Sequence, residues 1–303
     1  MKTHRVKTIS EYHQLRSLPK AEHPLISVID YTKIVRPQNI SEVNWVFEFY
    51  IICLKRGFGA KIKYGQSTYD FDEGTMFFIA PNQVFRIEPD TESTEQKSGW
   101  MLLIHPDFLW NSPLANKIKQ YEYFEYSADE ALFLSEKEEL KVKDIIENIR
   151  QEYSANIDAF SQSIIVSQIE TLLNYSERFY QRQFITRKKE NHRILEQVEK
   201  LLAEYFNSEN LIDKGVPTVQ YIADSLNISP RYLSSLMKVS TGLNTQQFIH
   251  EKLIEKAKEM LSVTQLSISE IAYDLGFEHP QSFSKFFKAK TQLTPLAFRQ
   301  SFN

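Results

Sequence analysis

The chain of 303 residues contains one cysteine, eight glycines and no long apolar run. A single cysteine cannot form an intrachain disulfide, so a reducing cytoplasm is the simplest location. The sequence has neither the Gly-Lys-Ser/Thr of a phosphate-binding loop nor the Gly-x-Ser-x-Gly of a nucleophile motif, and we expect Cys53 to be a buried structural thiol. The most apolar stretch, residues 46–54, contains Glu48 and is too short to span a bilayer, and residues 1–15 lack the apolar core of a secretion signal. These absences argue against a membrane protein and against several classes of enzyme.

Charge is unevenly distributed along the chain. The formal net charge of −3 argues at first against a nucleic-acid partner. Residues 1–186 carry 21 Lys and Arg against 26 Asp and Glu, whereas residues 187–303 carry 15 against 13. Two domains are expected at this length, and only the C-terminal part is mildly basic. If that part binds nucleic acid, its cations must be concentrated on one surface.

The N-terminal half has the pattern of a β domain followed by helices. Over residues 50–86, short apolar or alternating runs are separated by glycines, which is typical of strands in a meander or small barrel. Another apolar run, residues 99–105, predicts a buried strand. Apolar residues then recur at helical spacing over residues 136–153 and 157–180, without Gly or Pro, which predicts two long helices. We place a charged linker at residues 186–191 and the two domains at residues 1–183 and 184–303.

The C-terminal domain contains an internal repeat. Residues 219–226 and 268–275 share apolar positions 49 residues apart, and after a turn that is one residue longer in the second copy the offset becomes 50. Each copy is a short helix with a central alanine, a tight turn and a second short helix. Ala223 and Ala272 would let the paired helices approach closely. The pattern predicts two helix-turn-helix units joined by a Gly- and Pro-free helix over residues 245–261.

The second helix of each unit has an apolar face and a polar face. At about 100° per residue, large apolar side chains cluster on one side: Leu233, Leu236 and Met237 in the first copy, and Phe283, Phe286 and Phe287 in the second. The opposite faces contain hydrogen-bonding and cationic side chains without a carboxylate: Arg231, Ser234, Ser235 and Lys238, and then Gln281, Ser284, Lys285 and Lys288. Such side chains bind base edges and phosphates. A linking helix of about 25 Å is close to the length of one DNA turn, roughly 34 Å. The repeat therefore favours duplex DNA as partner over an all-α interaction domain with solvated polar faces.

Motifs of the C-terminal domain also match a known family in their order. They are Ser267-Ile268-Ser269-Glu270-Ile271-Ala272, Leu275-Gly276-Phe277, Ser282-Phe283-Ser284-Lys285-Phe286-Phe287-Lys288 and Pro295-Leu296-Ala297-Phe298-Arg299 in the second unit. The first unit contributes Ile222-Ala223, Ser229, Leu233, Lys238 and Thr241-Gly242. Over about residues 192–303 the chain thus resembles the AraC/XylS family of bacterial transcription regulators.

The resemblance implies which residues contact bases. They are Arg231, Ser234 and Ser235 in the first unit, and Gln281, Ser284 and Lys285 in the second. Ser235 stands where many members have arginine, so the first unit would bind DNA less tightly or depend on Arg231. Pro280 stands where relatives often have a polar residue; proline suits a helix N-terminus but removes a donor. The family implies a sequence-specific DNA-binding regulator with RNA polymerase as a partner, and activation and repression are both compatible with these features.

The N-terminal β segment is similar to the cupin-like sensory domain of many family members, through its strand pattern and residues 78–81 and 103–108. The expected fold class is therefore α+β, with an N-terminal cupin-like β-barrel with flanking helices and a C-terminal all-α domain of two helix-turn-helix units. The analogy implies a small-molecule effector in the barrel and a homodimer formed by helices. The alternative is an effector-independent DNA-binding protein whose N-terminal domain serves only for dimerisation.

A cupin fold also raises the alternative of a metal-dependent enzyme. Metal cupins need clustered imidazoles, but no two of the seven histidines lie within five residues of each other. Only His105 follows an expected strand, and we expect it to be a polar cap beside Pro106. We therefore expect no catalytic residue, metal or cofactor. Aromatic residues that could line an effector pocket, or simply pack in the core, are Tyr50, Tyr64, Tyr69, Phe71, Phe77, Phe78 and Phe85. Arg86 could pair with an anionic effector or form a surface salt bridge.

Overall fold

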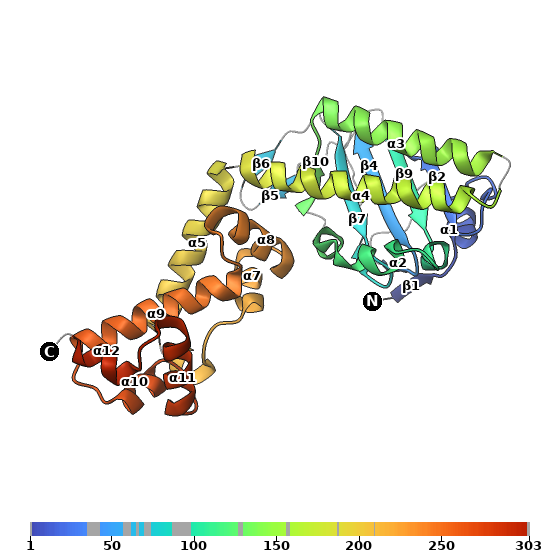
Figure 1. The fold of residues 1–303 in the computed structure, drawn as a ribbon. Coiled ribbons are helices and arrows are strands. Elements are labelled where there is room, and N and C mark those ends of the chain that lie inside the picture. Colours follow the sequence, from blue (N-terminus) through green and yellow to red (C-terminus); the bar gives the residue numbers. More distant parts are fainter. Residues whose placement is uncertain are drawn as a thin grey trace. The chain divides into compact units, whose positions relative to one another are not determined.

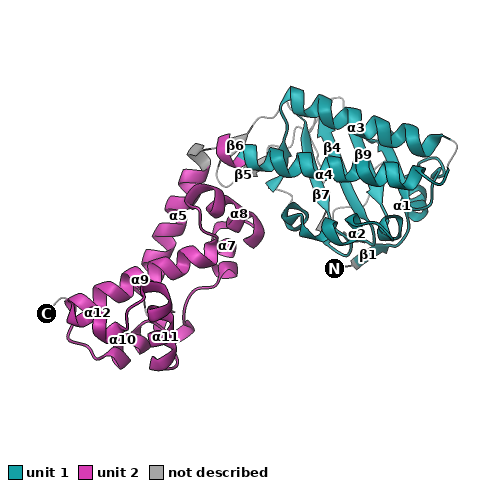
Figure 2. Cartoon of the chain, in the orientation of Figure 1, with its two compact units in different colours: residues 1–183 teal, residues 184–303 magenta. Residues whose placement is uncertain are grey.

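The computed structural model describes residues 2–34, 43–56, 62–64, 67–69, 74–86, 98–126, 130–155, 158–186, 188–208 and 210–301. The chain separates into two compact units, residues 1–183 (unit 1) and 184–303 (unit 2) (Figure 2). Unit 1 combines sheets with helices, and unit 2 is built from helices (Figure 1). No helix in the described part of the chain has both the length and the apolarity needed to cross a membrane.

The strands of unit 1 form open sheets. The three-stranded sheet has the order β1 (Lys2–Val6), β3 (Val43–Phe47), β8 (Val84–Arg86), and β1 and β3 run parallel. The five-stranded antiparallel sheet has the order β10 (Leu132–Phe133), β7 (Thr75–Ile79), β4 (Tyr50–Arg56), β9 (Ser98–Ile104), β2 (Ile26–Asp30). A hairpin joins β5 (Ile62–Tyr64) to β6 (Ser67–Tyr69). The strands expected within residues 50–86 and 99–105 are confirmed, but the described strands do not close into the expected barrel.

The two larger sheets and helix α1 (Ile9–Leu15) enclose one apolar core. Strand β1 contributes Val6, β3 contributes Trp45 and Phe47, and β4 contributes Ile51 and Cys53. The first five residues of β4 are all buried, because the other face of the five-stranded sheet is covered as well. On that second face, the ring centroid of Phe78 lies 4.5 Å from that of Tyr123.

Helices α3 (Glu136–Ser154) and α4 (Ser161–Thr186) cross this second face (Figure 1). Short helical segments contact α4: the Phe108 carbonyl of η2 (Pro106–Leu109) accepts from Gln162, Lys117 of α2 (Leu114–Lys117) pairs with Glu170, and Tyr123 of η4 (Glu122–Glu125) donates to the Leu173 carbonyl. The segment η3 (Ile118–Gln120) lies between α2 and η4 in the chain, and η1 (Tyr31–Lys33) follows β2. The first predicted helix is confirmed. The second begins four residues later than predicted, because the Asp158 carboxylate accepts the backbone N–H groups of Phe160 and Ser161 and so fixes the helix start.

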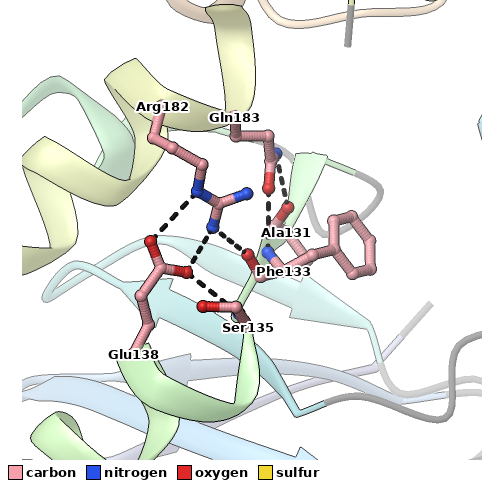
Figure 3. Close-up of polar contacts among 6 residues, drawn as sticks. All are labelled: Ala131, Phe133, Ser135, Glu138, Arg182 and Gln183. Carbon is pink, nitrogen blue, oxygen red and sulfur yellow. Dashed lines mark hydrogen bonds and ion pairs between the residues drawn. The ribbon is translucent and has the colours of Figure 1, made fainter. Parts of the chain in front are cut away.

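The last turn of α4 closes the free edge of β10 (Figure 3). The buried Gln183 amide accepts the N–H of Phe133 at 2.9 Å and donates to the carbonyl of Ala131 at 3.2 Å. Arg182 donates to the Phe133 carbonyl and to both carboxylate oxygens of Glu138. Side chains thus supply the hydrogen bonds that a neighbouring strand would otherwise make.

Unit 2 consists of eight helices in the described residues. They are α5 (Lys188–Phe206), α6 (Asn210–Lys214), α7 (Val219–Leu226), α8 (Pro230–Thr241), α9 (Thr245–Val263), α10 (Ile268–Asp274), α11 (Pro280–Thr291) and α12 (Pro295–Gln300). Helix α5 begins at Lys188, so residues 188–191 are helical and the prediction that they belong to a linker was wrong. Polar, charged sequence indicated a break there, but Asn191 is buried and donates to the Phe184 carbonyl, which stabilises helix at this point.

Candidate nucleic-acid interface

The sequence repeat is also a repeat of local geometry. The turns after α7 and α10 each contain a residue with positive φ, Asn227 at 54° and Gly276 at 76°. Helices α8 and α11 end in the left-handed region as well, at Gly242 and Gln292. A left-handed residue reverses the chain sharply, so both helix pairs are closed by equivalent turns.

The helix that follows each turn ends with the same hydrogen bonds. In the first copy, the Thr241 hydroxyl donates to the Met237 carbonyl at 2.7 Å and accepts the Leu243 N–H at 3.2 Å. In the second copy, Thr291 makes the corresponding bonds at 2.8 and 3.3 Å to residues 287 and 293. Two helix-turn-helix units of one design are therefore present in unit 2.

The apolar faces of α8 and α11 pack in the core, as predicted from the angular pattern. Ala223, Ala272 and the predicted apolar residues Leu233, Leu236, Met237, Phe283 and Phe287 are all completely buried. Phe286 differs from the prediction, because it is only partly buried. Its ring lies at the edge of the core, 5.1 Å from His250 of α9 and 5.6 Å from Phe277.

The opposite faces of α8 and α11 are polar and cationic. Neither helix contains a carboxylate. The larger outward side chains predicted from the sequence are exposed: Arg231, Lys238, Gln281, Lys285 and Lys288. Ser234, Ser235 and Ser284 are partly buried. Within the described part of unit 2, the side chains of Gln281, Lys285 and Lys288 make no hydrogen bond or ion pair, so their polar ends can bind a partner without breaking an internal contact.

Two polar residues near these faces have contacts that the spacing could not reveal. The Ser234 hydroxyl lies 3.3 Å from the hydroxyl of Thr245, which is fully buried at the start of α9. Ser234 therefore helps to position α8 on α9. Lys290, the remaining cation of α11, forms a 3.3 Å ion pair with Glu251 of α9. Its angular position on α8 placed Ser234 on the outward face. That position could not reveal the contact with Thr245, because Thr245 belongs to the next helix.

Helix α9 holds the two units together. Its 19 residues correspond to about 28 Å of α-helix. An Asn244–Gln247 capping box fixes its start, and near its other end the Leu261 carbonyl accepts from Arg299 of α12 at 3.2 Å. Because α9 contacts α8 near its start and α11 through His250 and Glu251, the two polar faces are carried on one rigid support.

The candidate pocket residues of unit 1 that are described pack in its interior. Tyr50 and Phe78 are buried, with ring centroids 5.2 and 5.6 Å from that of Phe124. Phe77 is partly buried, with the Lys55 ammonium 5.1 Å from its ring centroid. The remaining candidates, Tyr64, Tyr69, Phe71, Phe85 and Arg86, have side chains outside the described residues. Core packing accounts for the described members.

His105 and Cys53, the residues of unit 1 that were considered as a metal ligand and as a nucleophile, have structural roles. The His105 side chain accepts the Asp107 N–H at 3.3 Å and caps η2, as predicted. Cys53 is buried, as predicted, and burial raises the pKa of its thiol. Among the described residues, no group of three or more His, Cys, Asp or Glu side chains comes together to hold a metal ion.

Comparison with known proteins supports the assignment of the helical repeat. A family model described as a helix-turn-helix domain matches residues 222–301. The chain is 28% identical over 259 residues to the uncharacterized HTH-type transcriptional regulator YfiF of Bacillus subtilis, covering 83% of this chain and 76% of that protein. It is 32% identical over 79 residues to the HTH-type transcriptional activator RhaS of Escherichia coli O157:H7, covering 26% of this chain and 28% of that activator. A solved structure, the C-terminal domain of the response regulator AraT from Geobacillus stearothermophilus, covers 36% of this chain and 84% of its own at 29% identity, with a TM-score of 0.32.

Proposed function

We propose, from the premise that the chain is a DNA-binding transcription regulator of the AraC/XylS family, that α8 and α11 enter successive major grooves of duplex DNA. Gln281 and Lys285 would contact base edges from α11, and Arg231 would do so from α8. Lys238 and Lys288, further along the two helices, would contact phosphates. Ser235 and Ser284 are smaller hydrogen-bonding groups on the same faces.

The observation that carries this proposal is the pair of carboxylate-free polar faces mounted on one rigid helix. Each face lies on the second helix of a helix-turn-helix unit, which is the element that such units place in the major groove. The length of α9, about 28 Å, suits two readers separated by roughly one turn of DNA, about 34 Å. Ser234 contributes by fixing α8 on α9 through Thr245.

Unit 1 is proposed to act as a cupin-like sensory and dimerisation domain. The support is a core enclosed between two sheets and α1, with α3 and α4 on the outer face of the larger sheet. Leu140 of α3 and Phe160 and Ile164 at the start of α4 are exposed apolar side chains that a homodimer would bury. A small-molecule effector bound in unit 1 would then control DNA binding, with RNA polymerase as the downstream partner, in the cytoplasm and without enzymatic activity.

Binding-site selection with the full chain, followed by footprinting, tests the proposal. We expect one preferred sequence and protection of about two helical turns on one face of the duplex. Lys285→Ala should weaken binding to the selected site. Lys258→Ala is the matched control, because it removes the same charge from α9 without touching α8 or α11. A folded chain that selects no sequence would contradict the proposal.

A further inference from the structure

Two buried hydrogen-bond donors of unit 1 lie beside each other without an acceptor. Arg16 and Trp45 are each only 4% exposed. Neither the Nε of Arg16 nor the indole nitrogen of Trp45 has a hydrogen-bond partner among the described residues. The Arg16 guanidinium carbon lies 5.5 Å from the Trp45 ring and 5.5 Å from the Tyr12 ring. Buried donors are nearly always paired in folded proteins, so this pair requires an explanation.

The fold holds both donors firmly in place. Arg16 is the C-terminal cap of α1, where its backbone N–H donates to the carbonyls of Tyr12 and Gln14. Trp45 lies in the middle of β3, opposite His4 of β1, and the two rings are 4.9 Å apart. Both residues border the core enclosed between the two sheets, where Trp45 stacks on Phe47. The donors are therefore preorganised rather than able to turn toward solvent.

Among the residues that the structure describes, no side chain near Arg16 supplies a compensating negative charge. In the described ranges, Arg16 forms no ion pair with a carboxylate. Burial raises the pKa of Tyr12 to about 12, although the charge of the neighbouring Arg16 and a hydrogen bond from its side chain both act in the opposite direction, and burial also raises the pKa of the Cys53 thiol. Both groups are therefore neutral near pH 7. The Tyr12 hydroxyl itself donates to the Met101 sulfur at 3.2 Å.

Two further polar side chains of the described residues, Lys55 and His4, border this region, and neither is a carboxylate. Lys55 follows Ile51 and Cys53 on the same face of β4, and its ammonium lies 5.1 Å from the Tyr31 and Phe77 rings. The His4 ring lies against Trp45, with the two ring planes tilted by 60°. Cation–π contacts stabilise a guanidinium only partly, and a buried charge without a counter-ion is costly. The described side chains around Arg16 and Trp45 are thus mainly aromatic, and no carboxylate is among them.

We propose that Arg16 and Trp45 bind the carboxylate of a small apolar acid. The two donors would each bond a carboxylate oxygen, and the guanidinium would supply the counter-charge. The body of the ligand would be apolar or aromatic, because the neighbouring side chains are Tyr12, Phe47 and Met101. The inference names the chemical class of effector and so rests on the proposed function, although binding itself can be measured without DNA.

The test uses the full chain and matched pairs of probes. Phenylacetate with phenylacetamide, and hexanoate with hexanamide, keep the shape of the ligand and change its charge. We expect thermal stabilisation and calorimetric binding for the acids, at least tenfold tighter than for the amides. Arg16→Met should abolish this preference, and Trp45→Phe, which retains a ring but removes the N–H donor, should weaken acid binding severalfold. Arg150→Met, the same change at an arginine on α3, should bind like the parent chain.

Stability without ligand gives an independent readout. If Arg16 binds an anionic ligand that is absent from the free protein, the melting temperature of Arg16→Met should be no lower than that of the parent, because the change removes a buried charge that has no counter-ion. A large drop in melting temperature with unchanged acid binding would show that Arg16 is only a structural clamp. Equal binding of acids and amides, equal stabilisation by inorganic phosphate, or no binding by any acid would each overturn the inference.

DNA affinity measured in parallel separates this inference from the proposed function. Acid binding that leaves operator affinity unchanged would retain the site and refute its role as the effector site. Operator affinity that responds to a neutral probe equally in the parent and in Arg16→Met would retain effector control and refute the acid site.

Discussion

Helix α11 provides three lysines with different surroundings, which allows contacts to bases and to phosphates to be separated. Lys285 and Lys288 are exposed on the polar face, whereas Lys290 is paired with Glu251. Lys288 lies three residues, or about 4.5 Å along the axis, beyond Lys285, where a helix in the groove approaches the backbone. We expect Lys285→Ala to lose discrimination of about 1–3 kcal/mol at one or two adjacent base pairs. This corresponds to about 5- to 150-fold in affinity.

Lys288→Ala should leave the preferred sequence intact. A lost phosphate contact weakens binding to all sequences similarly and reduces the slope of log affinity against log salt concentration by about one. Lys290→Ala is the control, because it removes an exposed ion pair that contributes about 0–1 kcal/mol to stability and lies off the polar face. Affinities for a panel of single-base operator variants at two salt concentrations would distinguish the three variants. If Lys285→Ala and Lys288→Ala lose affinity equally on every operator, Lys285 is only an electrostatic anchor and its assignment as a base contact is wrong.

Three further predictions concern stability and domain independence. Gln183→Leu should destabilise unit 1 by about 2–6 kcal/mol, since it leaves two buried backbone groups at β10, the Phe133 N–H and the Ala131 carbonyl, unpaired at about 1–3 kcal/mol each. The substitution Gln181→Leu at the exposed neighbouring position should stay within about 0.5 kcal/mol in the same denaturant titration. Gly276→Ala should destabilise unit 2 by about 2–5 kcal/mol, because its φ is +76° and a Cβ would lie 2.3 Å from the Leu211 carbonyl oxygen. Gly242→Ala, with φ +79° and nothing within 4 Å, should cost only about 1–2 kcal/mol, and equal losses would exclude the steric explanation. Residues 184–303 alone should unfold cooperatively and protect the same operator as the full chain; a folded fragment without a selectable site would contradict this.

The helix-turn-helix units could be predicted because their information is local and duplicated. Apolar residues three and four positions apart define each helix. The same succession of two helices recurs 49 to 50 residues later, which indicates that each pair of helices forms one unit. Contacts between helices carry no such signal. The sequence could not show that Ser234 bonds to Thr245, because that contact depends on how α8 sits on α9. Phe286 was grouped with the buried residues of α11 but is only partly buried, because the apolar face of α11 is wider than the part of it that contacts the core.

Unit 1 was predictable at the level of strands and helices and less so in their assembly. Apolar runs separated by glycines located β4 to β7, and a further apolar run located β9. Closure of a sheet, however, depends on long-range pairing that short apolar runs do not specify. The start of α4 depends on the Asp158 carboxylate, which accepts backbone N–H groups at the helix start. Asp158 lies inside the stretch of residues 157–180 that was predicted as helix, so the apolar pattern did not reveal this start. The function of Gln183 was invisible in the sequence, since a glutamine near a helix end is usually solvated and only the fold brings it to the edge of β10.

The charge distribution explains how an acidic chain can bind a polyanion. The two second helices hold five cations, Arg231, Lys238, Lys285, Lys288 and Lys290, and no acid, so the rest of the chain is more acidic than the whole. With Lys290 neutralised by Glu251, at most four cations remain on the polar faces. Repulsion between DNA and the acidic remainder of the chain disfavours binding of DNA to surfaces other than these polar faces. If these cations are the main phosphate contacts, counterion release contributes less to affinity than in a polycationic protein. A correspondingly larger share would then come from the base contacts proposed for α8 and α11. A modest cationic surface on an acidic protein therefore favours sequence-specific over non-specific binding.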